Sequence, residues 1–520
     1  MPSPVVPHRS WQALVVALVL FAAGFAAANR YQLAHGVLYR AAANDWASAA
    51  GNLFWLGIQA LTLAAAIALL GRRLFVLAMV LAFGSIVVNL GYGHTLAEVI
   101  DAGKLSWMLI EARQAGNAAG EFTGPLLLAA LQAAAAIGLF VAARHCARRG
   151  GWTVHGARAA GAGGGLLLLP SLIAAFGAPA VAAERNLYSL GLEVALAEPP
   201  PPRPPVDLQS DLAGTPRHVV WLVDESVAFR SFQEIVAPRL ADIPHIDFGI
   251  TASLGHCSAP SNLALRSGVD VRRADPALDL RRTPSIWAYA RKAGYRTVLI
   301  DGQTRGVPQN LLLPPERALI DEVAAAAGPI DADVQIADRI NRQLKQRERT
   351  FTYAVLRGVH FQYRDHYPSG LIPADSPPWR HYAAALDYSK ARFFDRLLQG
   401  VNREEVAIVY TSDHGQNLEP GAIPHCSPEP AASELHVPLI AFLPDRLAAR
   451  YRGAKKSEHS ASQIFPATLT WMGYDVAAVE RRYDNDLSSA PARYVHFDRN
   501  VVPLHSGDPI GVTVGDIFPR

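Results

Sequence analysis

The sequence predicts a membrane-anchored protein in two parts: an α-helical transmembrane domain of five helices, followed by an exported α/β domain with a mostly parallel sheet covered by helices. Composition supports this fold class, because half of the 520 residues are hydrophobic and only 18% are charged. That is too apolar for an ordinary soluble enzyme of this length. The apolar excess is concentrated before residue 185, whereas the remainder resembles a globular α/β protein.

Five apolar segments account for the excess, and each is close to the ~20 residues that a helix needs to cross a bilayer core. Basic residues lie before the first segment and after the second and fourth. The positive-inside rule therefore places the amino terminus in the cytoplasm and exports everything after the fifth segment. Buried helices of a large soluble domain are the alternative, but they leave the alternation of loop charge unexplained. The segments span residues 11–29, 52–71, 74–93, 122–143 and 162–183.

A connecting region follows the fifth segment. Leucines between Leu187 and Leu196 predict a short interfacial helix. The sequence EPPPPRPP at 198–205 cannot continue a helix and is expected to form a stiff, extended spacer. These features divide the chain into a transmembrane domain at 1–183, an interfacial helix and Pro-rich linker at 184–216, and an exported α/β domain at 217–520.

Beyond residue 217, apolar strands alternate with helical segments. Continuous apolar strands separated by helices are typical of a parallel sheet that is buried on both faces. About 300 residues are ample for such a core. Strands are predicted at 218–226, 296–301, 351–358, 406–412 and 437–443, and an amphipathic helix at 284–294.

Two of these strands end in side chains that commonly bind metals. The strand at 406–412 leads directly into Asp413 and His414, and the first strand ends in Asp224 and Glu225. In open α/β sheets ligands bind outside the carboxyl ends of the strands. We therefore expect Glu225, Asp413 and His414 to converge on one metal ion. Taken singly, each pair is also explained as a capped turn or a helix amino-terminal cap.

The segment GHCSAPSNLALRSG at 255–268 contains a candidate nucleophile. It is a loop of small residues leading into a helix, whose first backbone N–H groups can bind phosphate or sulfate. From Ser258 onward it has the spacing of the sulfatase signature, with Asn262 where sulfatases carry the Arg needed to form formylglycine. An unmodified Ser258 hydroxyl is therefore the expected nucleophile, with Cys257 as the alternative register. A serine-rich helix cap is the structural alternative.

Together these features resemble the alkaline phosphatase/sulfatase superfamily, and within it the membrane-bound phosphoethanolamine transferases that decorate lipid A and related glycans. The resemblance spans nearly the whole chain and implies a sulfatase-like exported domain. It also implies that one Zn²⁺ ion is held by Glu225, Ser258, Asp413 and His414. The family nucleophile is usually Thr, and Ser258 preserves its hydroxyl chemistry. Mn²⁺ suits the same ligand types.

The resemblance extends to substrate-binding residues. The segment GVHFQYRDHYP is similar to the family sequence after the third strand, which places His360 at a substrate-contacting position. His425, eleven residues beyond His414, is similar to a later histidine on the transferred phosphate. In the family, the second exported loop carries a polar patch at the membrane surface, and the second exported loop of this chain resembles that patch loosely. Further candidate site residues are Asp224, Cys257, Asp301 and, in that loop, Glu111, Asn117 and Glu121.

The implied function is metal-dependent transfer of phosphoethanolamine from phosphatidylethanolamine, through a covalent Ser258 intermediate, to a lipid A or other envelope glycan acceptor. The chain is then a multi-pass protein of the bacterial inner membrane with its catalytic domain in the periplasm, in contact with membrane lipids. Two other functions remain open: a sulfatase-fold phosphohydrolase or glycerol-phosphate transferase, and a non-catalytic membrane sensor or scaffold. A net charge of +3 without a Lys/Arg tract gives no support for nucleic-acid binding.

Three cysteines are too few for a disulfide-framework protein. Cys146 falls on the cytoplasmic side of the predicted topology, whereas Cys257 and Cys426 are exported and flank the candidate residues Ser258 and His425. An exported pair can oxidise, and such a bridge would join two loops of the site. Two free buried thiols are the alternative.

Overall fold

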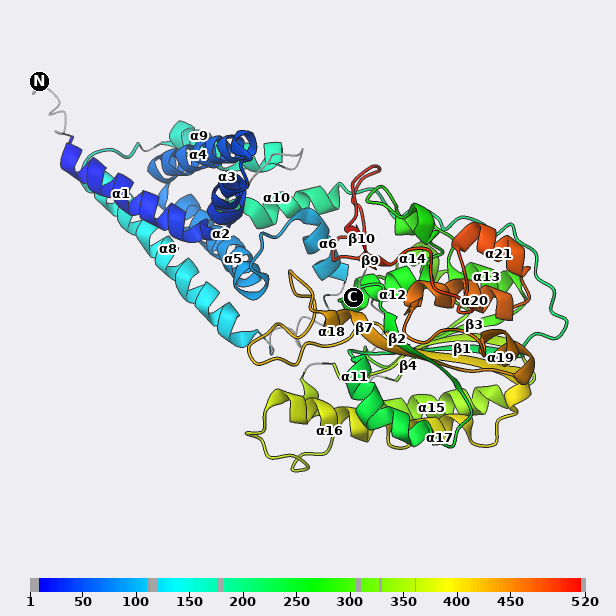
Figure 1. The fold of residues 1–520 in the computed structure, drawn as a ribbon. Helices are drawn as coiled ribbons and strands as arrows, with labels where there is room; N and C mark the ends of the chain where they lie inside the picture. Colours follow the sequence, from blue (N-terminus) through cyan, green and yellow to red (C-terminus); the bar gives the residue numbers. More distant parts are fainter. Residues whose placement is uncertain are drawn as a thin grey trace, which may run out of the picture. The chain divides into compact units, whose positions relative to one another are not determined.

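The computed structural model describes the chain except for residues 1–8, 111, 113–119, 121, 155, 175–180, 305–309, 327–329, 361 and 516–520. Contacts divide the chain into two units (Figure 1). The first consists of Met1–Ser106 and Ala118–Ala197, and the second of Trp107–Asn117 and Glu198–Arg520.

The first unit is helical, which confirms the prediction of an apolar amino-terminal helical region. Four of its helices, α1, α4, α5 and α8, are long and apolar enough to cross a membrane, and they coincide with four of the five predicted segments. The fifth predicted segment begins within α9, and its residues 175–180 lie outside the described part of the chain. The main helices are α1 (Trp11–Ala28), α4 (Trp46–Leu69), α5 (Arg72–Leu96), α8 (Thr123–Arg149), α9 (Ala157–Ala174) and α10 (Ala183–Ala195).

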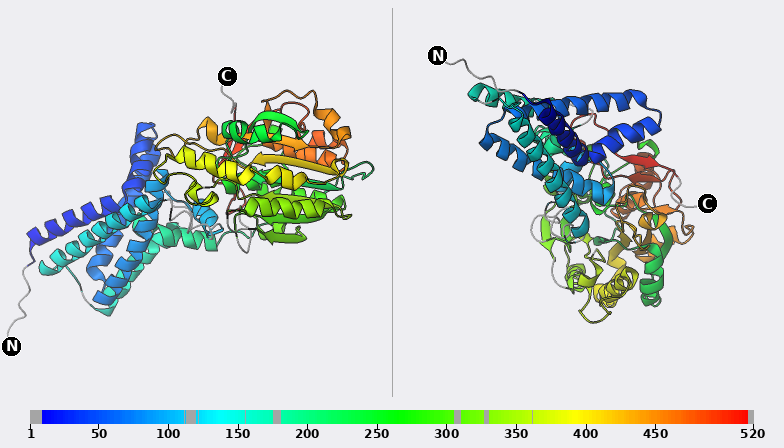
Figure 2. Two further views of the ribbon diagram at one scale, coloured as in Figure 1. Left: turned by 90° about the horizontal axis from the view of Figure 1, so that it is seen from below. Right: turned by 90° about the vertical axis from the view of Figure 1, so that its left-hand side faces the viewer.

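Shorter elements complete this unit. The helix α2 (Arg30–Leu33), the π-helix η1 (Ala34–Leu38) and α3 (Tyr39–Ala42) follow α1. Helix α6 (Ala102–Ile110) follows α5, and only its part up to Ser106 belongs to this unit. Helices α1 and α8 run side by side (Figures 1 and 2). Gly24 permits this close packing, because a Cβ atom there would lie 3.1 Å from the Ala136 carbonyl oxygen.

The first turn of α10 is held by polar side chains from three other helices. The first N–H groups of a helix lack partners within the helix. Here the Ala183 N–H donates to Asn29 Oδ1 at 2.7 Å, and the Ala182 N–H donates to Gln59 Oε1 at 2.9 Å. The Ser85 hydroxyl donates to the Ala183 carbonyl at 2.6 Å. The helix predicted near the membrane surface is thus anchored through buried polar groups to α4, α5 and the end of α1.

The second unit is built on an eight-stranded sheet with the order β4-β3-β5-β1-β6-β7-β2-β8. All neighbouring pairs are parallel except those made by β7, which is antiparallel to both β6 and β2. This confirms the prediction of a mostly parallel sheet. The strands are β1 (His218–Asp224), β2 (Ile246–Ala252), β3 (Arg296–Asp301), β4 (Glu322–Ala325), β5 (Thr350–Val355), β6 (Val406–Ser412), β7 (His436–Phe442) and β8 (His459–Ser460).

Helices cover both faces of this sheet (Figures 1 and 2). One face carries α12 (Ser258–Arg266), α13 (Ile286–Lys292), α20 (Ile464–Trp471) and α21 (Val476–Tyr483), and the other carries α15 (Ala332–Leu344), α16 (Pro378–Lys390) and α17 (Phe393–Leu398). Shorter elements are α11 (Phe229–Ser231), α14 (Pro314–Arg317), α18 (Ala432–Leu435), α19 (Asp445–Tyr451) and the antiparallel pair β9 (Val495–Phe497) and β10 (Val512–Val514).

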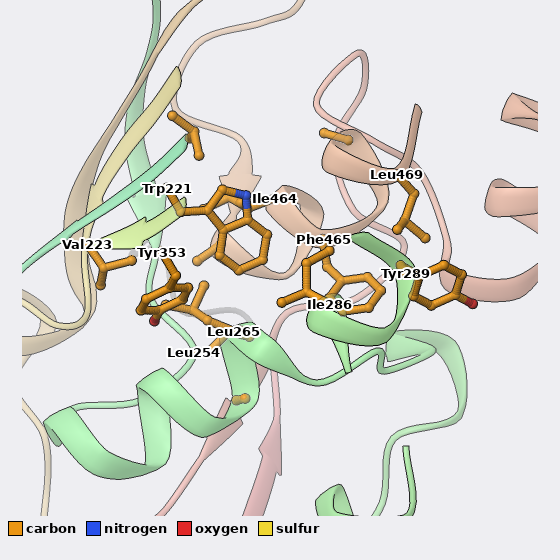
Figure 3. Close-up of a cluster of buried hydrophobic side chains, with 14 of the residues drawn as sticks. Trp221, Val223, Leu254, Leu265, Ile286, Tyr289, Tyr353, Ile464, Phe465 and Leu469 are labelled. Carbon is orange, nitrogen blue, oxygen red and sulfur yellow. The ribbon is translucent and has the colours of Figure 1, made fainter. Parts of the chain in front are cut away.

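Strand β1 shows why the sheet is buried on both faces. Successive side chains of a strand point to opposite faces. Trp221 and Val223 enter one hydrophobic cluster, shown in Figure 3, whereas Val220 and Leu222 enter the cluster on the opposite face. The buried indole of Trp221 donates to the Thr468 hydroxyl at 2.8 Å, so its polar group is satisfied. The continuous apolar run in the sequence therefore corresponds to a central strand.

Candidate active site

The site begins where β1 and β6 end side by side. These strands are parallel, and Asp224 lies opposite Ser412. The next residues along each strand, Glu225 and Asp413, therefore leave the same edge of the sheet. The backbone then turns sharply, since Ser226 has a φ of 61°, and the Ser226 N–H donates to Asp413 Oδ1 at 3.1 Å. Strand pairing thus brings together residues almost 190 positions apart in the sequence.

Glu225, Asp413 and His414 form a buried group suited to a metal ion. One ligand atom from each lies within 4.8 Å of the others, and each residue is at most 1% exposed. His414 Nδ1 is 2.7 Å from the Gly415 carbonyl oxygen, a contact that places a proton on Nδ1 and leaves Nε2 as the ligand atom. Two carboxylates and one imidazole nitrogen are ligand types that suit Zn²⁺ or Mn²⁺.

The electrostatics of this group also favour a cation. Burial and the neighbouring Glu225 carboxylate raise the pKa of Asp413 to about 8. Burial lowers the pKa of His414, but the Asp413 and Glu225 carboxylates outweigh it and raise that pKa to about 9. Asp413 and His414 thus hold protons more tightly than usual, whereas the pKa of Glu225 is lowered and its carboxylate stays charged. A metal ion can take the place of such protons.

The Ser258 hydroxyl lies beside these ligands. Ser258 Oγ donates to Glu225 Oε1 at 2.8 Å and is 3.1 Å from His414 Nε2. Ser258 is the first residue of α12, so it lies among the free N–H groups of a helix amino terminus. The preceding residue, Cys257, is bonded to Cys426 and has no free thiol to act as a nucleophile. The geometry therefore favours Ser258 over the neighbouring register.

Two supporting residues were not expected from the sequence. The Asn262 amide donates to the Ser258 carbonyl at 2.9 Å and to Asp413 Oδ2 at 3.4 Å, and it accepts from the Tyr353 hydroxyl at 2.6 Å. The Gln303 amide donates to Glu225 Oε2. Asn262 lies four residues after Ser258, so the helical period is a signal that could have revealed it. Gln303 follows β3 in a loop, where no periodicity marks it.

The predicted residues Asp224 and Asp301 lie beside the metal-binding group but do not belong to it. Asp224 Oδ1 accepts from the Glu225 N–H at 3.0 Å. Asp301 Oδ1 accepts from the backbone N–H groups of Gln303 and Thr304, at 2.8 and 3.1 Å. Asp301 therefore shapes the loop that presents Gln303 to Glu225.

The predicted histidines border the same group. The rings of His414 and His425 are stacked with centroids 4.7 Å apart, and His360 lies next to His425 with a centroid distance of 5.8 Å. His425 Nδ1 is 3.2 Å from Gln416 Oε1. Burial and the nearby His414 hold the pKa of His425 well below its usual value, so its imidazole is neutral. The structure thus brings together the four predicted residues of the site core, Glu225, Ser258, Asp413 and His414, and both predicted histidines.

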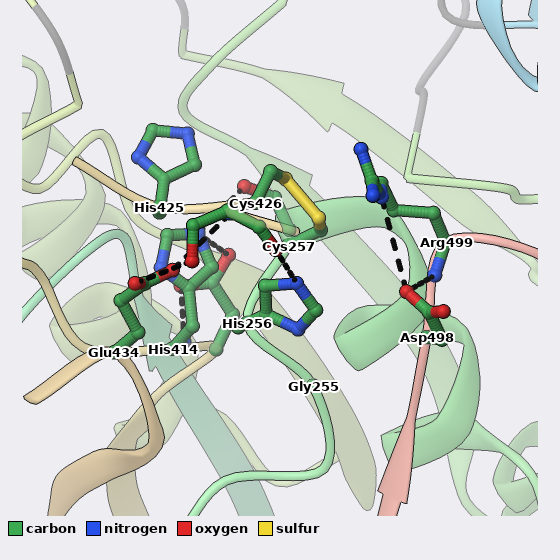
Figure 4. The surroundings of a disulfide bond; sticks show 12 residues. Gly255, His256, Cys257, His414, His425, Cys426, Glu434, Asp498 and Arg499 are labelled. Carbon is green, nitrogen blue, oxygen red and sulfur yellow. Dashed lines mark hydrogen bonds and ion pairs between the residues drawn. A yellow bond between two sulfur atoms is a disulfide. The ribbon is translucent and has the colours of Figure 1, made fainter. Parts of the chain in front are cut away.

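A disulfide joins two loops of the site (Figure 4). Cys257 caps α12 directly before Ser258, and Cys426 directly follows His425. The bonded pair closes a sequence separation of 169 residues, and the Cys426 N–H also donates to the His256 carbonyl at 2.8 Å. Of the two alternatives open at the sequence level, the structure contains the bridge. The other predicted candidates, Glu111, Asn117 and Glu121, lie outside the described residues.

Comparisons with known proteins agree with this architecture. Residues 217–474 match the family model described as Sulfatase. The full-length integral membrane lipooligosaccharide phosphoethanolamine transferase A from Neisseria meningitidis matches with 15% identity and a TM-score of 0.55, covering 90% of this chain and 96% of that chain. This match shows a shared fold over both units.

Isolated domains match as well. The periplasmic domain of EptC from Escherichia coli matches with 16% identity and a TM-score of 0.46, covering 57% of this chain and 94% of that chain. The corresponding EptC domain from Campylobacter jejuni has 16% identity and a TM-score of 0.44, covering 55% of this chain and 97% of that chain. No curated protein matches the sequence.

Proposed function

We propose that this membrane protein, whose residues 217–474 form a sulfatase-family domain, transfers phosphoethanolamine from phosphatidylethanolamine to lipid A or another envelope glycan. One observation carries the proposal: the Ser258 hydroxyl lies 2.8 Å from Glu225 and 3.1 Å from His414, inside a buried group of metal-type ligands. The protein that shares its fold over 90% of the chain is named a lipooligosaccharide phosphoethanolamine transferase, which supports this choice of donor and acceptor.

The same proposal assigns parts and location. Residues 1–183 are the transmembrane domain, 184–216 the connecting region, and 217–520 the periplasmic catalytic domain of a bacterial inner-membrane protein. Both substrates of the proposed reaction are carried by membranes. A membrane anchor therefore keeps the catalytic domain at the surface where donor and acceptor are found.

Glu225, Asp413 and His414 would hold one zinc-class ion, with Ser258 Oγ as a further ligand. A bound ion of this class lowers the pKa of a hydroxyl and offsets the charge of a phosphate. The buried carboxylates and the His414 Nε2 atom, which faces Ser258 Oγ and Glu225, fit that requirement. Gln303, Asn262 and the Gly415 carbonyl keep the three ligands oriented.

The side chains of the site divide the work of the first half-reaction. Ser258 Oγ attacks the head-group phosphorus, a new Ser258 O–P bond forms, and the bond between phosphorus and the diacylglycerol oxygen breaks. The Ser258 hydroxyl proton is lost to water, and His360 delivers a proton to the diacylglycerol oxygen. The neutral imidazole of His425 binds a phosphate oxygen. The first N–H groups of α12 stabilise the phosphate oxygens. In the second half-reaction the acceptor oxygen takes the phosphoethanolamine, and Ser258 regains its proton.

An assay with labelled phosphatidylethanolamine tests this function. Membranes that contain the full-length protein are supplied with donor labelled in the ethanolamine group, and the products are separated. We expect label on lipid A or an envelope glycan, and none when Ser258→Ala replaces the native chain. Release of free phosphoethanolamine alone would make the protein a phosphohydrolase. No label movement, together with no bound metal, would make it a sensor or scaffold.

A further inference from the structure

A buried lysine contacts Asp224, the residue directly before Glu225. Lys390 is the last residue of α16, and its side chain is fully buried. Its ammonium lies 2.8 Å from Asp224 Oδ2 and 2.7 Å from Asp333 Oδ2. Burial lowers the pKa of Lys390, but the two carboxylates outweigh it and raise the pKa above its usual value. Lys390 is therefore a fixed cation shared by two buried anions.

The first of these anions holds the backbone of a predicted metal ligand. Asp224 Oδ1 accepts from the Glu225 N–H at 3.0 Å, while Asp224 Oδ2 accepts from the Tyr410 hydroxyl at 2.5 Å. Lys390 and Tyr410 together fix the orientation of the carboxylate. That orientation sets where Glu225 leaves the end of β1.

The second anion holds the segment that leads to His360. Asp333 accepts from the backbone N–H groups of Arg357 and Gly358, at 2.7 and 3.3 Å. This segment is pressed against Glu225: a Cβ atom on Gly358 would lie 2.6 Å from the Glu225 carbonyl oxygen and from Asp224 Oδ1. The adjoining Val359 N–H donates to the Glu225 carbonyl at 3.1 Å. The end of β1 at Glu225 and the segment at Gly358–Val359 are therefore tightly packed, so a shift of one displaces the other.

We propose that Lys390 is a positioning residue, a buried cation that joins Asp224 and Asp333 and thereby sets the position of Glu225 relative to the segment carrying His360. Neither carboxylate belongs to the metal-binding group, so their burial is not explained by metal ligation. A buried ion pair alone is weak evidence for a role in stability, because apolar replacements are often tolerated. Here both carboxylates also accept hydrogen bonds from backbone N–H groups of the site. The ion pair of Lys390 therefore helps to position that backbone. The part concerning His360 rests on the proposed function, whereas the part concerning Glu225 requires only that the site binds metal.

Lys390→Met tests the inference in the full-length, detergent-solubilised protein. Zinc affinity is measured by competition with a chelator, alongside thermal unfolding. We expect zinc affinity to fall by about 10- to 100-fold, the range found when partners of metal ligands are removed. With saturating zinc, kcat should fall while the KM for phosphatidylethanolamine stays within about twofold, because the chemistry and not lipid binding depends on Glu225. A merely structural lysine would lower the unfolding temperature and leave both quantities unchanged.

Two further variants complete the test. Lys455→Met is the matched control, since the Lys455 side chain is 81% exposed, and it should bind zinc as the native chain does. Tyr410→Phe removes one hydrogen bond to Asp224 without changing the charge of the site. If Lys390→Met does not fold, this variant tests whether the orientation of Asp224 controls zinc affinity. We expect a roughly threefold loss of zinc affinity in Tyr410→Phe, about that expected for one hydrogen bond.

Native zinc affinity in folded Lys390→Met, or in Tyr410→Phe when Lys390→Met does not fold, would overturn the inference. Because the zinc measurement uses no lipid, it stays readable even if the native protein transfers no phosphoethanolamine. Failure of the inference and failure of the proposed function are therefore distinguishable.

Discussion

The Ser258 hydroxyl is the atom on which the proposed chemistry depends, and its replacement gives the sharpest prediction at the scale of a residue. Ser258→Ala should lower the transfer rate by on the order of 10³-fold or more, because it removes the group that carries the covalent intermediate. Zinc affinity should fall by a smaller factor than the transfer rate, since Glu225, Asp413 and His414 remain. The measurement is transfer of labelled phosphoethanolamine together with zinc content.

Ser258→Thr is the matched control for that variant. It keeps the hydroxyl and adds one methyl group, so we expect activity within about tenfold of the native chain. The Ser258 residue is partly exposed, so the added methyl group is not placed in a fully enclosed core position. Transfer that persists in Ser258→Ala would show that another group carries the phosphoethanolamine.

A second prediction at this scale concerns Glu316, a buried carboxylate that pairs with Arg203 of the Pro-rich linker. Glu316 is fully buried between Arg203 and Arg266, with N–O distances of 2.9 and 3.1 Å. Burial raises the pKa of Glu316, but the two guanidinium groups outweigh it and hold the pKa below its ordinary value of 4.5. We expect Glu316→Gln to lower the free energy of unfolding of the second unit by about 3–5 kcal/mol, because two buried cations lose their partner.

The pH dependence of that effect follows from the direction of the shift. Since the folded pKa is depressed, the stability from Glu316 is fully present above the unfolded value near 4.5. It is lost as pH falls below 4.5 and through the folded pKa. Denaturant unfolding at several pH values between 3 and 7 should therefore show a difference between native and Glu316→Gln protein that shrinks toward the acid end. A difference that is constant with pH would contradict this account.

At the scale of elements, the disulfide between the cap of α12 and the loop of His425 should matter for both stability and activity. Replacing Cys257 and Cys426 together by Ala removes a bridge that closes a long loop. We expect the free energy of unfolding to fall by about 2–5 kcal/mol. Transfer activity should fall as well, because Ser258 and His425 adjoin the two bonded residues. Denaturant unfolding and the labelled-lipid assay measure these effects.

Chemical reduction of the native protein provides the control for the double variant. Reductant should reproduce both losses in the native chain and have no effect on the variant, which lacks the bridge. If complete reduction of the native bridge left melting temperature and activity unchanged, the disulfide would contribute to neither stability nor catalysis.

The linker shows what the sequence could not predict about an element. Its prolines correctly exclude a helix, since no helix or strand lies within residues 198–205. They do not reveal that the Arg203 side chain bonds Glu316 and the Thr283 carbonyl, the latter at 3.1 Å. Such a contact depends on the packing of segments far apart in the sequence. The same reason explains why Lys390 and Gln303 were not expected near the site.

At the scale of the whole molecule, the order of apolar helices and basic loops predicts which side of the membrane each part occupies. Cys146 is the one free cysteine, and it lies in the last turns of α8, on the cytoplasmic side of the proposed topology. A membrane-impermeant maleimide should therefore leave Cys146 unlabelled in intact spheroplasts and label it after permeabilisation. The control is the Cys146→Ala variant, which should stay unlabelled in both states. Labelling of Cys146 in intact spheroplasts would contradict the proposed topology and place this end of α8 outside the cytoplasm.

Much of the architecture could be predicted because burial leaves a direct trace in the sequence. Central strands such as β1 and β6 read as unbroken apolar runs, and the ligands Glu225, Asp413 and His414 directly follow their ends. The antiparallel direction of β7 could not be predicted, since a strand buried on both faces reads the same in either direction. β2 contains Asp247 and Gly249, with a bulge between Asp247 and Ile250, so it lacks that apolar signature.

The most direct test of the central claim is mass spectrometry of the Ser258 peptide after the full-length protein meets phosphatidylethanolamine. The account predicts a phosphoethanolamine group on Ser258 in metal-loaded protein, and its loss when a chelator removes the metal first. A metal-loaded, folded protein that carries the group on another residue, or that never carries it while still transferring label, would contradict the account.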